Sequence, residues 1–173
     1  MAWEGFDHVL KWIALVIFLV LAALGLIAVL GSQLPEQHKA SRTAEFHQSP
    51  QQLWNIIFGP PTWRPEVTRY EVLAPDPDRK WIEYGRHGQK MTYEVVEADP
   101  PHKLVTRIAD PHLPFGGSWT YEIAPTAAGS SLTITEHGEI YNPVFRFVAR
   151  YLQGYTATID NYLRALRAKL DAS

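Results

Sequence analysis

Residues 12–31 restrict this chain more than any other segment, because they contain no charged and no strongly polar side chain. An α-helix rises about 1.5 Å per residue, so these twenty residues span roughly 30 Å, the thickness of the hydrocarbon core of a bilayer. A helix of this length in a soluble protein normally carries a polar stripe, and this segment has none. We therefore predict a single membrane-spanning helix.

A cleaved signal peptide is the alternative interpretation, since one positive charge, Lys11, precedes the apolar run. The apolar part of a signal peptide has about 7–15 residues, and this run is longer. We interpret residues 1–34 as an uncleaved anchor, residues 35–38 as a linker and residues 39–173 as one soluble domain. The protein is thus expected to be a single-pass membrane protein.

The charges and the absence of cysteine exclude several functions. Sixteen Lys and Arg residues oppose eighteen Asp and Glu residues, giving a net charge of -2, so no basic field would hold a nucleic acid. A chain without cysteine has no disulfide, no thiolate metal site and no cysteine nucleophile. Lys11 and the amino terminus before the apolar run are balanced by Lys39 and Arg42 after it, so the positive-inside rule does not decide on which side of the membrane the domain lies.

Prolines and short polar links separate runs rich in Val, Ile, Thr, Tyr and Trp, which is typical of strands. Several links are only a few residues long, which favours antiparallel hairpins over crossover helices. We predict strands at roughly residues 39–47, 67–74, 80–87, 90–98, 102–110, 117–125 and 130–141.

Two segments carry helix signals. Ser49 followed by Pro50 and Gln52 is typical of a capped helix start and predicts a short helix over residues 49–58. Asn142 and Pro143 repeat the signal, and apolar residues then recur every three or four positions, which predicts one long helix from 142 to about 170 with an apolar face of about seven turns. The opposite face is basic and contacts either lipid headgroups or water; its residues are Arg146, Arg150, Arg164, Arg167 and Lys169.

Residues 49–67 read SPQQLWNIIFGPPTWRPEV, with a Ser-Pro turn, a Leu53-Trp54 step and a later Trp63-Arg64-Pro65. Together with the order of the elements, this segment resembles the polyketide cyclase and dehydrase-like branch of the START-related (SRPBCC, birch-allergen-like) superfamily, over residues 38–170. The resemblance implies an α+β helix-grip fold. In such a fold a curved antiparallel sheet, here of seven strands, surrounds a long C-terminal helix, and a ligand cavity lies between them.

Glu136 is the candidate chemical group in the last predicted strand. Alternation along this strand places Glu136 on the same face as Leu132 and Ile134. A carboxylate in an apolar wall is costly unless it is paired or protonated, so Glu136 is a candidate ligand contact or general acid or base. The alternative is that the strand bends outward at Gly138 and leaves Glu136 in water.

The same alternation places aromatic and hydroxyl side chains around the implied cavity. Such a lining suits a flat or lipid-like apolar ligand, although aromatic residues at strand spacing also form ordinary cores. The candidate ligand-binding residues are Tyr84, Tyr93, Thr106, Trp119, Tyr121, Glu136, Tyr151 and Tyr155.

No motif indicates a metal or a cofactor. His137 and Glu139 share one face of a predicted strand, but their spacing is not that of a zinc helix. The pair Gly116-Gly117 begins a strand and is not a phosphate-binding loop.

We consider three functions. The leading hypothesis is a membrane-anchored protein that binds a hydrophobic small molecule or lipid. The second is an enzyme of the cyclase, dehydratase or hydrolase type that uses Glu136 as a general acid or base. The third is a non-catalytic domain that binds a protein partner, of unknown identity, at the membrane.

Overall fold

The computed structural model describes residues 2–76, 78–86 and 88–172. Its centre is a seven-stranded antiparallel sheet in the order β1-β7-β6-β5-β4-β3-β2. The strands are β1 (Gln37–Phe46), β2 (Val67–Ala74), β3 (Lys80–Gly85), β4 (Lys90–Asp99), β5 (Lys103–Ile108), β6 (Phe115–Thr126) and β7 (Gly129–Ile140). The helices are α1 (Ala2–Ser32), α2 (Pro50–Ile57), the 3-10 helix η1 (Pro61–Trp63), α3 (Pro143–Val148), the π-helix η2 (Ala149–Gln153) and α4 (Ala157–Asp171).

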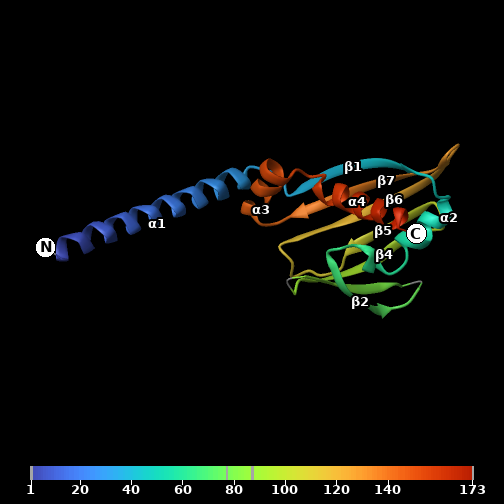
Figure 1. Cartoon of the computed structure of the whole chain (residues 1–173), viewed down its shortest axis with the longest axis horizontal. Coiled ribbons are helices and arrows are strands. Elements are labelled where there is room, and N and C mark those ends of the chain that lie inside the picture. The colour runs from blue at the N-terminus through green and yellow to red at the C-terminus, as the bar shows by residue number, and fades with distance from the viewer. Residues whose placement is uncertain (1, 77, 87, 173) are drawn as a thin grey trace.

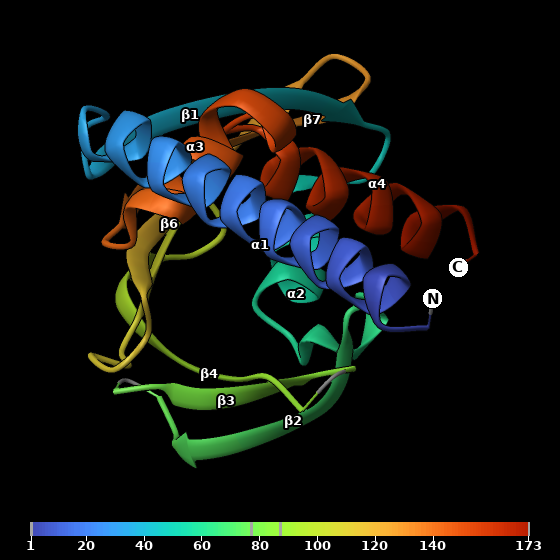
Figure 2. The same cartoon turned by 90° about the vertical axis from the view of Figure 1, so that its left-hand side faces the viewer.

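The sheet curves from β1 and β7 round to β3 and β2, with α4 beside β1 (Figure 2). The helix-grip architecture expected from the sequence is confirmed. One apolar cluster fills the space between the sheet, α2 and α4, because each of these elements turns an apolar face inward. Its buried members include Phe46, Leu53, Trp54, Leu104, Ile123, Leu132, Ile134, Ile159, Leu163 and Leu166.

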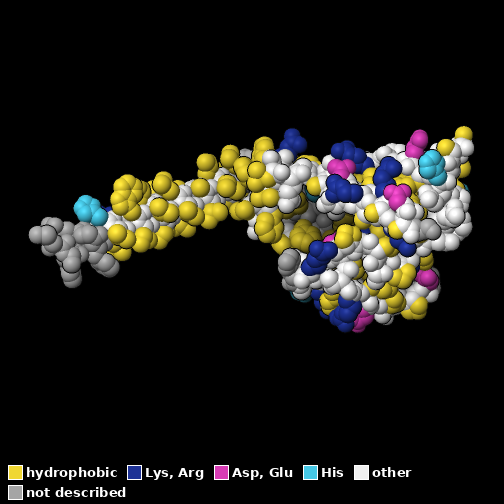
Figure 3. Space-filling model, in the orientation of Figure 1, with side chains coloured by type: hydrophobic (Ala, Val, Ile, Leu, Met, Phe, Trp, Pro, Cys, Tyr) yellow, Lys and Arg dark blue, Asp and Glu magenta, His cyan; other side chains and the backbone are white. Residues whose placement is uncertain are grey.

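Helix α1 extends away from the sheet as one continuous helix (Figure 1). The part from His8 to Ser32 is long and apolar enough to cross a membrane, and the domain covers none of its most apolar stretch. A signal sequence passes the same test of length and composition. On the face shown in Figure 3, hydrophobic side chains cover the described part of α1 along its length.

Helix α2 begins with the predicted cap. The Ser49 side chain accepts a hydrogen bond from the Gln52 backbone N–H, and the Gln52 side chain accepts one from the Ser49 N–H. This reciprocal capping box, with Pro50 in the first turn, explains why the helix begins here. Leu53 and Trp54 then become buried in the core, at the end of the sheet that lies away from α1 (Figure 1).

The prediction of one continuous C-terminal helix is wrong. The chain forms α3, then the π-helix η2, and Gly154 interrupts it with φ = 78° before α4 begins. Glycine adopts positive φ without a steric penalty, and here it lets the chain change direction. Only α4 packs its apolar face on the sheet; Phe145, Tyr151 and Leu152 of the first part are exposed.

The junction between α1 and the domain is tightly built. A Cβ on Gly31 would lie 1.8 Å from the carbonyl oxygen of Pro143, so only glycine allows α1 to pack this closely against the start of α3. Arg146 donates hydrogen bonds to the Leu34 carbonyl (2.9 Å) and to the Glu36 carboxylate (3.1 Å). Arg146 is therefore a buried clamp on the connection, not a member of an outer basic face as its spacing suggested.

Candidate functional site

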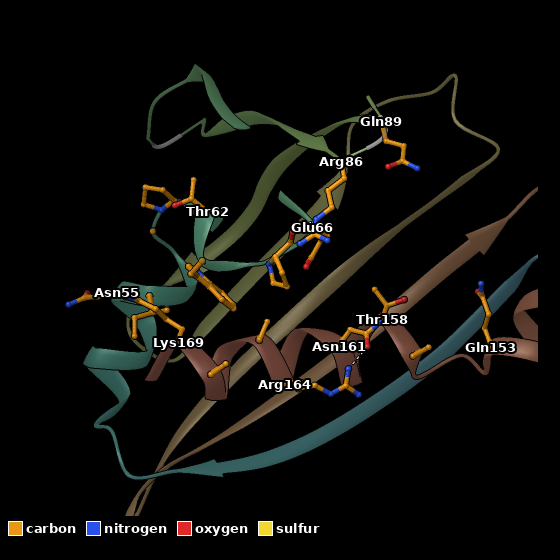
Figure 4. Close-up of a pocket in the computed structure, with 18 residues that line it drawn as sticks. Asn55, Thr62, Glu66, Arg86, Gln89, Gln153, Thr158, Asn161, Arg164 and Lys169 are labelled. Atoms are coloured by element: carbon orange, nitrogen blue, oxygen red, sulfur yellow. Dashed lines mark hydrogen bonds between the residues drawn. The ribbon is translucent and has the colours of Figure 1, made fainter. Parts of the chain in front are cut away.

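An open groove of about 1460 Å³ runs along α4 (Figure 4). Ala157, Ala165 and Ala168 face it from α4, and these short side chains leave the space open. Ile56 of α2 and Trp63 of η1 line it, together with Pro60 and Pro65 from the loops before and after η1. Figure 4 shows Arg86, Gln89 and Gln153 at one end of the groove and Asn55 and Lys169 at the other.

A small cavity of about 90 Å³ lies deeper, between the sheet and α4. Four residues predicted from the sequence, Tyr93, Thr106, Trp119 and Tyr121, line this cavity together. Their rings are close: Tyr93 and Trp119 have centroids 6.1 Å apart in an edge-to-face arrangement. Burial raises the pKa of Tyr121 to about 12, so its hydroxyl stays protonated and able to donate at neutral pH.

A buried ion pair, missed in the sequence analysis, borders the same cavity. The guanidinium of Arg64 donates a hydrogen bond to the carboxylate of Glu83, and the side chains are 14% and 7% exposed. The Trp81 indole N–H donates to the other Glu83 oxygen at 2.9 Å, and Tyr162 lies beside the guanidinium with 5.8 Å between Cζ and the ring centroid. Two charges removed from water need such partners, because an unpaired buried charge costs several kcal/mol.

Glu66 and Thr158 line both spaces, so the groove and the cavity are adjacent. A molecule in the groove could therefore place one end next to Arg64 and the tyrosine hydroxyls. No signal in the sequence identified Arg64 and Glu83 as partners, because they are 19 residues apart and lie on different elements, Arg64 at the end of η1 and Glu83 in β3.

The prediction that Tyr84 faces the cavity is wrong. Trp81 and Glu83 point inward from β3, and Tyr84 lies on the opposite face, where its hydroxyl donates to Glu71 at 2.9 Å and Arg69 covers its ring. The alternation of β3 does not show which of its faces is turned inward, because the strand has large side chains on both faces.

Two helix tyrosines also lie outside the cavity. Tyr151 is 60% exposed, because it belongs to η2 and not to a helix packed on the sheet. Tyr155 stacks on the imidazole of His38, with ring centroids 4.2 Å apart and planes at 15°. Neither is among the residues that line the groove or the cavity in the described part of the chain.

Glu136 is buried on the concave face, as the alternation of β7 predicted. Its Oε1 lies 3.9 Å from Nε2 of His38, and its Oε2 has no hydrogen-bond partner. Burial raises the pKa of Glu136, while a hydrogen bond from Trp119 opposes this shift. Burial also lowers the pKa of His38. Burial therefore favours the neutral imidazole of His38 and the protonated carboxyl of Glu136, which face each other.

Gly138 makes room for His38. The two residues pair across β1 and β7, and a Cβ on Gly138 would lie 2.2 Å from Cε1 of the imidazole. The strand therefore does not bend Glu136 into water at Gly138; the glycine instead lets a ring cover the carboxylate. Among the described residues, no group of three or more His, Cys, Asp or Glu side chains is arranged to hold a metal ion.

Comparisons with known proteins agree with this geometry. The structure is similar to a START superfamily protein from Mycobacterium smegmatis (TM-score 0.63, 18% identity, 78% of this chain and 98% of that chain). It is also similar to the di-domain ARO/CYC protein StfQ of the steffimycin biosynthetic pathway (0.61, 16%, 76% and 50%). A third similar structure is norcoclaurine synthase from Thalictrum flavum (0.60, 11%, 78% and 86%). At these identities the likeness concerns the fold.

No curated protein matches the sequence. The family model described as "Polyketide cyclase / dehydrase and lipid transport" matches residues 37–171, which is the whole sheet together with α2, α3 and α4. This range covers most of the chain and contains every residue of the groove and the cavity. The chain therefore belongs to the polyketide cyclase / dehydrase and lipid transport family.

Proposed function

We propose that this protein is a membrane-anchored binding protein for a hydrophobic small molecule or lipid. The observation that carries the proposal is the continuity of the two spaces: Glu66 and Thr158 join a wide groove to a small aromatic cavity with a buried ion pair. The apolar body of a ligand would lie against Trp63 and the alanines of α4. Its polar end would reach the tyrosine hydroxyls and Arg64.

The two volumes decide how a ligand would lie. One water occupies about 30 Å³ of liquid, so the 90 Å³ cavity holds a few waters or the end of a molecule. A drug-sized ligand needs about 300–1,000 Å³, which only the groove offers. The ligand would therefore be bound across the open groove and not enclosed behind α4, which differs from the internal cavity that the family resemblance implied.

The anchor part of the proposal is based on α1. Its apolar side chains, such as Leu21 and Leu26, are about 60% exposed in the isolated chain, and a bilayer would remove them from water. Membrane flotation tests this part: the full chain should float with lipid vesicles in high salt and in carbonate buffer. A chain that stays in the dense fraction would contradict the anchor.

The ligand part is tested by native mass spectrometry and extraction of compounds bound to the full chain after release in mild detergent. The variant Ala165→Trp would fill the groove, because Ala165 lines it. Ala128→Trp, in the exposed turn between β6 and β7, is the matched control. We expect a bound apolar compound in the wild type and in the control, and its loss in A165W. Equal retention in A165W would contradict binding in the groove.

A second candidate is an enzyme in which Glu136 acts as general acid or base. The buried carboxyl with its raised pKa and one unpartnered oxygen favours this function. However, Glu136 does not line the groove or the cavity in the described chain, so neither space brings a substrate into contact with it. Glu136→Gln distinguishes the two functions, because it should leave retention of the bound compound unchanged and abolish any conversion of it.

A further inference from the structure

The segment from α3 to η2 exposes more large apolar surface than any comparable stretch of the soluble domain. Outside α1, seven large hydrophobic residues of the described chain are exposed, and four of them lie between residues 141 and 152. Phe145 is 48% exposed, Tyr151 60% and Leu152 73%. A soluble domain usually covers such a cluster, so its exposure indicates a contact with an apolar partner.

The break in the helix creates this surface. A continuous helix would have turned Tyr151 and Leu152 onto the sheet, as their spacing predicted. Instead the π-helix and Gly154, with φ = 78°, separate residues 143–153 from α4 and direct them away from the core. Single π-turns of this kind are rare and occur frequently at functional sites.

The position of the segment points to its partner. Helix α3 packs beside the last turns of α1, at the end of the apolar run, and the Gly31–Pro143 contact and the Arg146 clamp fix the two helices together. If residues 12–31 fill the hydrocarbon core, α3 and η2 lie at the headgroup level. Figure 3 shows hydrophobic surface continuing from α1 onto this end of the domain.

The composition fits the same level of the bilayer. Phe, Tyr and Leu side chains next to an arginine are typical of the interfacial layer, where rings meet acyl chains and cations meet phosphates. Arg150 is exposed within the cluster and available to headgroups. Gln153, the next residue after Leu152, lines one end of the groove (Figure 4).

We propose that Phe145, Tyr151 and Leu152 insert into the interfacial layer of the bilayer that α1 spans, and that they bring the Gln153 end of the groove to the lipid surface. The proposal depends on the anchor part of the proposed function. It adds a second, shallow membrane contact, and it makes the bilayer the source from which an apolar ligand enters the groove.

The natural absence of cysteine allows a direct test, because each introduced thiol is labelled alone. Phe145→Cys and Leu152→Cys are labelled with an environment-sensitive fluorophore and reconstituted as full chain in phosphatidylcholine vesicles. Leu73→Cys, in the strand at the opposite edge of the sheet and 49% exposed, is the water control. Leu21→Cys, in the middle of α1, is the bilayer control. Three quenchers are compared: one attached to the lipid near the headgroup, one attached deep in the acyl chain to report on the label at 21, and one dissolved in the water.

We expect the labels at 145 and 152 to lose fluorescence with the shallow lipid quencher and to be shielded from the aqueous quencher, while the label at 73 does the reverse. If 145 and 152 behave like 73 while the label at 21 is still quenched by lipid, the interfacial contact is wrong and the anchor stands. If 145 and 152 are shielded from water without lipid quenching, protein covers them, in these vesicles a second copy of the chain, and the proposal is also wrong. Loss of lipid quenching at 21 would overturn the anchor, and this proposal with it.

Discussion

Glu83 and Glu136 are both buried carboxylates on the concave face of the sheet, but their surroundings differ. Glu83 receives hydrogen bonds on both oxygens, from Arg64 and from Trp81. Within the described part of the chain, Glu136 lies 3.9 Å from the imidazole of His38 and beside the Trp119 indole, and one of its oxygens has no hydrogen-bond partner. A buried carboxylate with hydrogen-bond donors on both oxygens stabilises the fold in its charged form. A buried carboxyl without such partners favours its protonated form, so its charge can respond to pH or to a ligand.

The largest expected effect comes from breaking the matched pair. Arg64→Met leaves the Glu83 charge buried without its cation, and removing one partner of a buried ion pair costs about 3–5 kcal/mol. We expect the free energy of unfolding to fall by this amount in urea titrations of the full chain in mild detergent, followed by tryptophan fluorescence.

The double variant Arg64→Met with Glu83→Leu is the control, since it removes both charges and should recover most of the loss. If R64M alone unfolds at the same urea concentration as the wild type, Glu83 is not held by Arg64 in solution. The distinction between the two carboxylates would then fail.

The second effect concerns the space beside Gly138, where the His38 ring lies against the Glu136 carboxyl. Gly138→Ala would place a methyl group 2.2 Å from the imidazole and force the ring away from the carboxylate. Overpacking of this kind typically costs about 1–3 kcal/mol. The loss should appear in the same urea titrations.

Adding His38→Ala to Gly138→Ala removes the ring that clashes, so the pair of substitutions should be less destabilised than the sum of the two single ones. Gly25→Ala, at a position in α1 where nothing lies within 4 Å, tests the effect of an added methyl group without a clash. Simple additivity of the two substitutions would show that Gly138 does not make room for His38.

The third effect sharpens the contrast through pH. Because the folded state raises the pKa of Glu136, it holds this proton more tightly than the unfolded chain, and stability falls as pH rises from about 4.5 through the raised value. Gln cannot ionise, so Glu136→Gln should be more stable than the wild type at pH 7, on the order of 1 kcal/mol, and equal to it in acid. Thermal unfolding of both proteins across this pH range measures the difference, with exposed Glu122→Gln as the control. A difference that does not vary with pH would contradict the raised pKa.

These two carboxylates also show which features of the site can be predicted from the sequence. The strict alternation of β7 was sufficient to place Glu136 inward, because its neighbours Leu132 and Ile134 define one face. The Ser49 capping box was readable for a similar reason: all of its contacts lie within four residues. The pair of Arg64 and Glu83 joins two different elements across 19 residues, so no pattern within a few residues indicates it.

The C-terminal segment differs from the predicted single helix for another physical reason. Apolar residues recur at helical spacing on both sides of Gly154, so periodicity alone predicts a continuous helix. The break depends on one glycine in the left-handed region and on the close packing of α3 against α1 at Gly31. The apolar pattern of residues 145–152 was correct, but the surface that it faces is not the sheet.

The smallest effect is expected at Tyr84, and it tests which face of β3 is functional. Tyr84→Phe removes only a hydroxyl that bonds to Glu71 at the surface, so the urea midpoint of unfolding and the retention of the bound compound should both stay unchanged. Tyr93→Phe is the matched change on the inner face, where the hydroxyl lies in the cavity lining and contacts the sulfur of Met91. It should weaken retention of a compound whose polar end reaches the cavity, measured by native mass spectrometry of the full chain. If Y84F weakens retention and Y93F does not, the ligand binds on the outer face of the sheet, and the cavity beside Glu83 has no part in recognition.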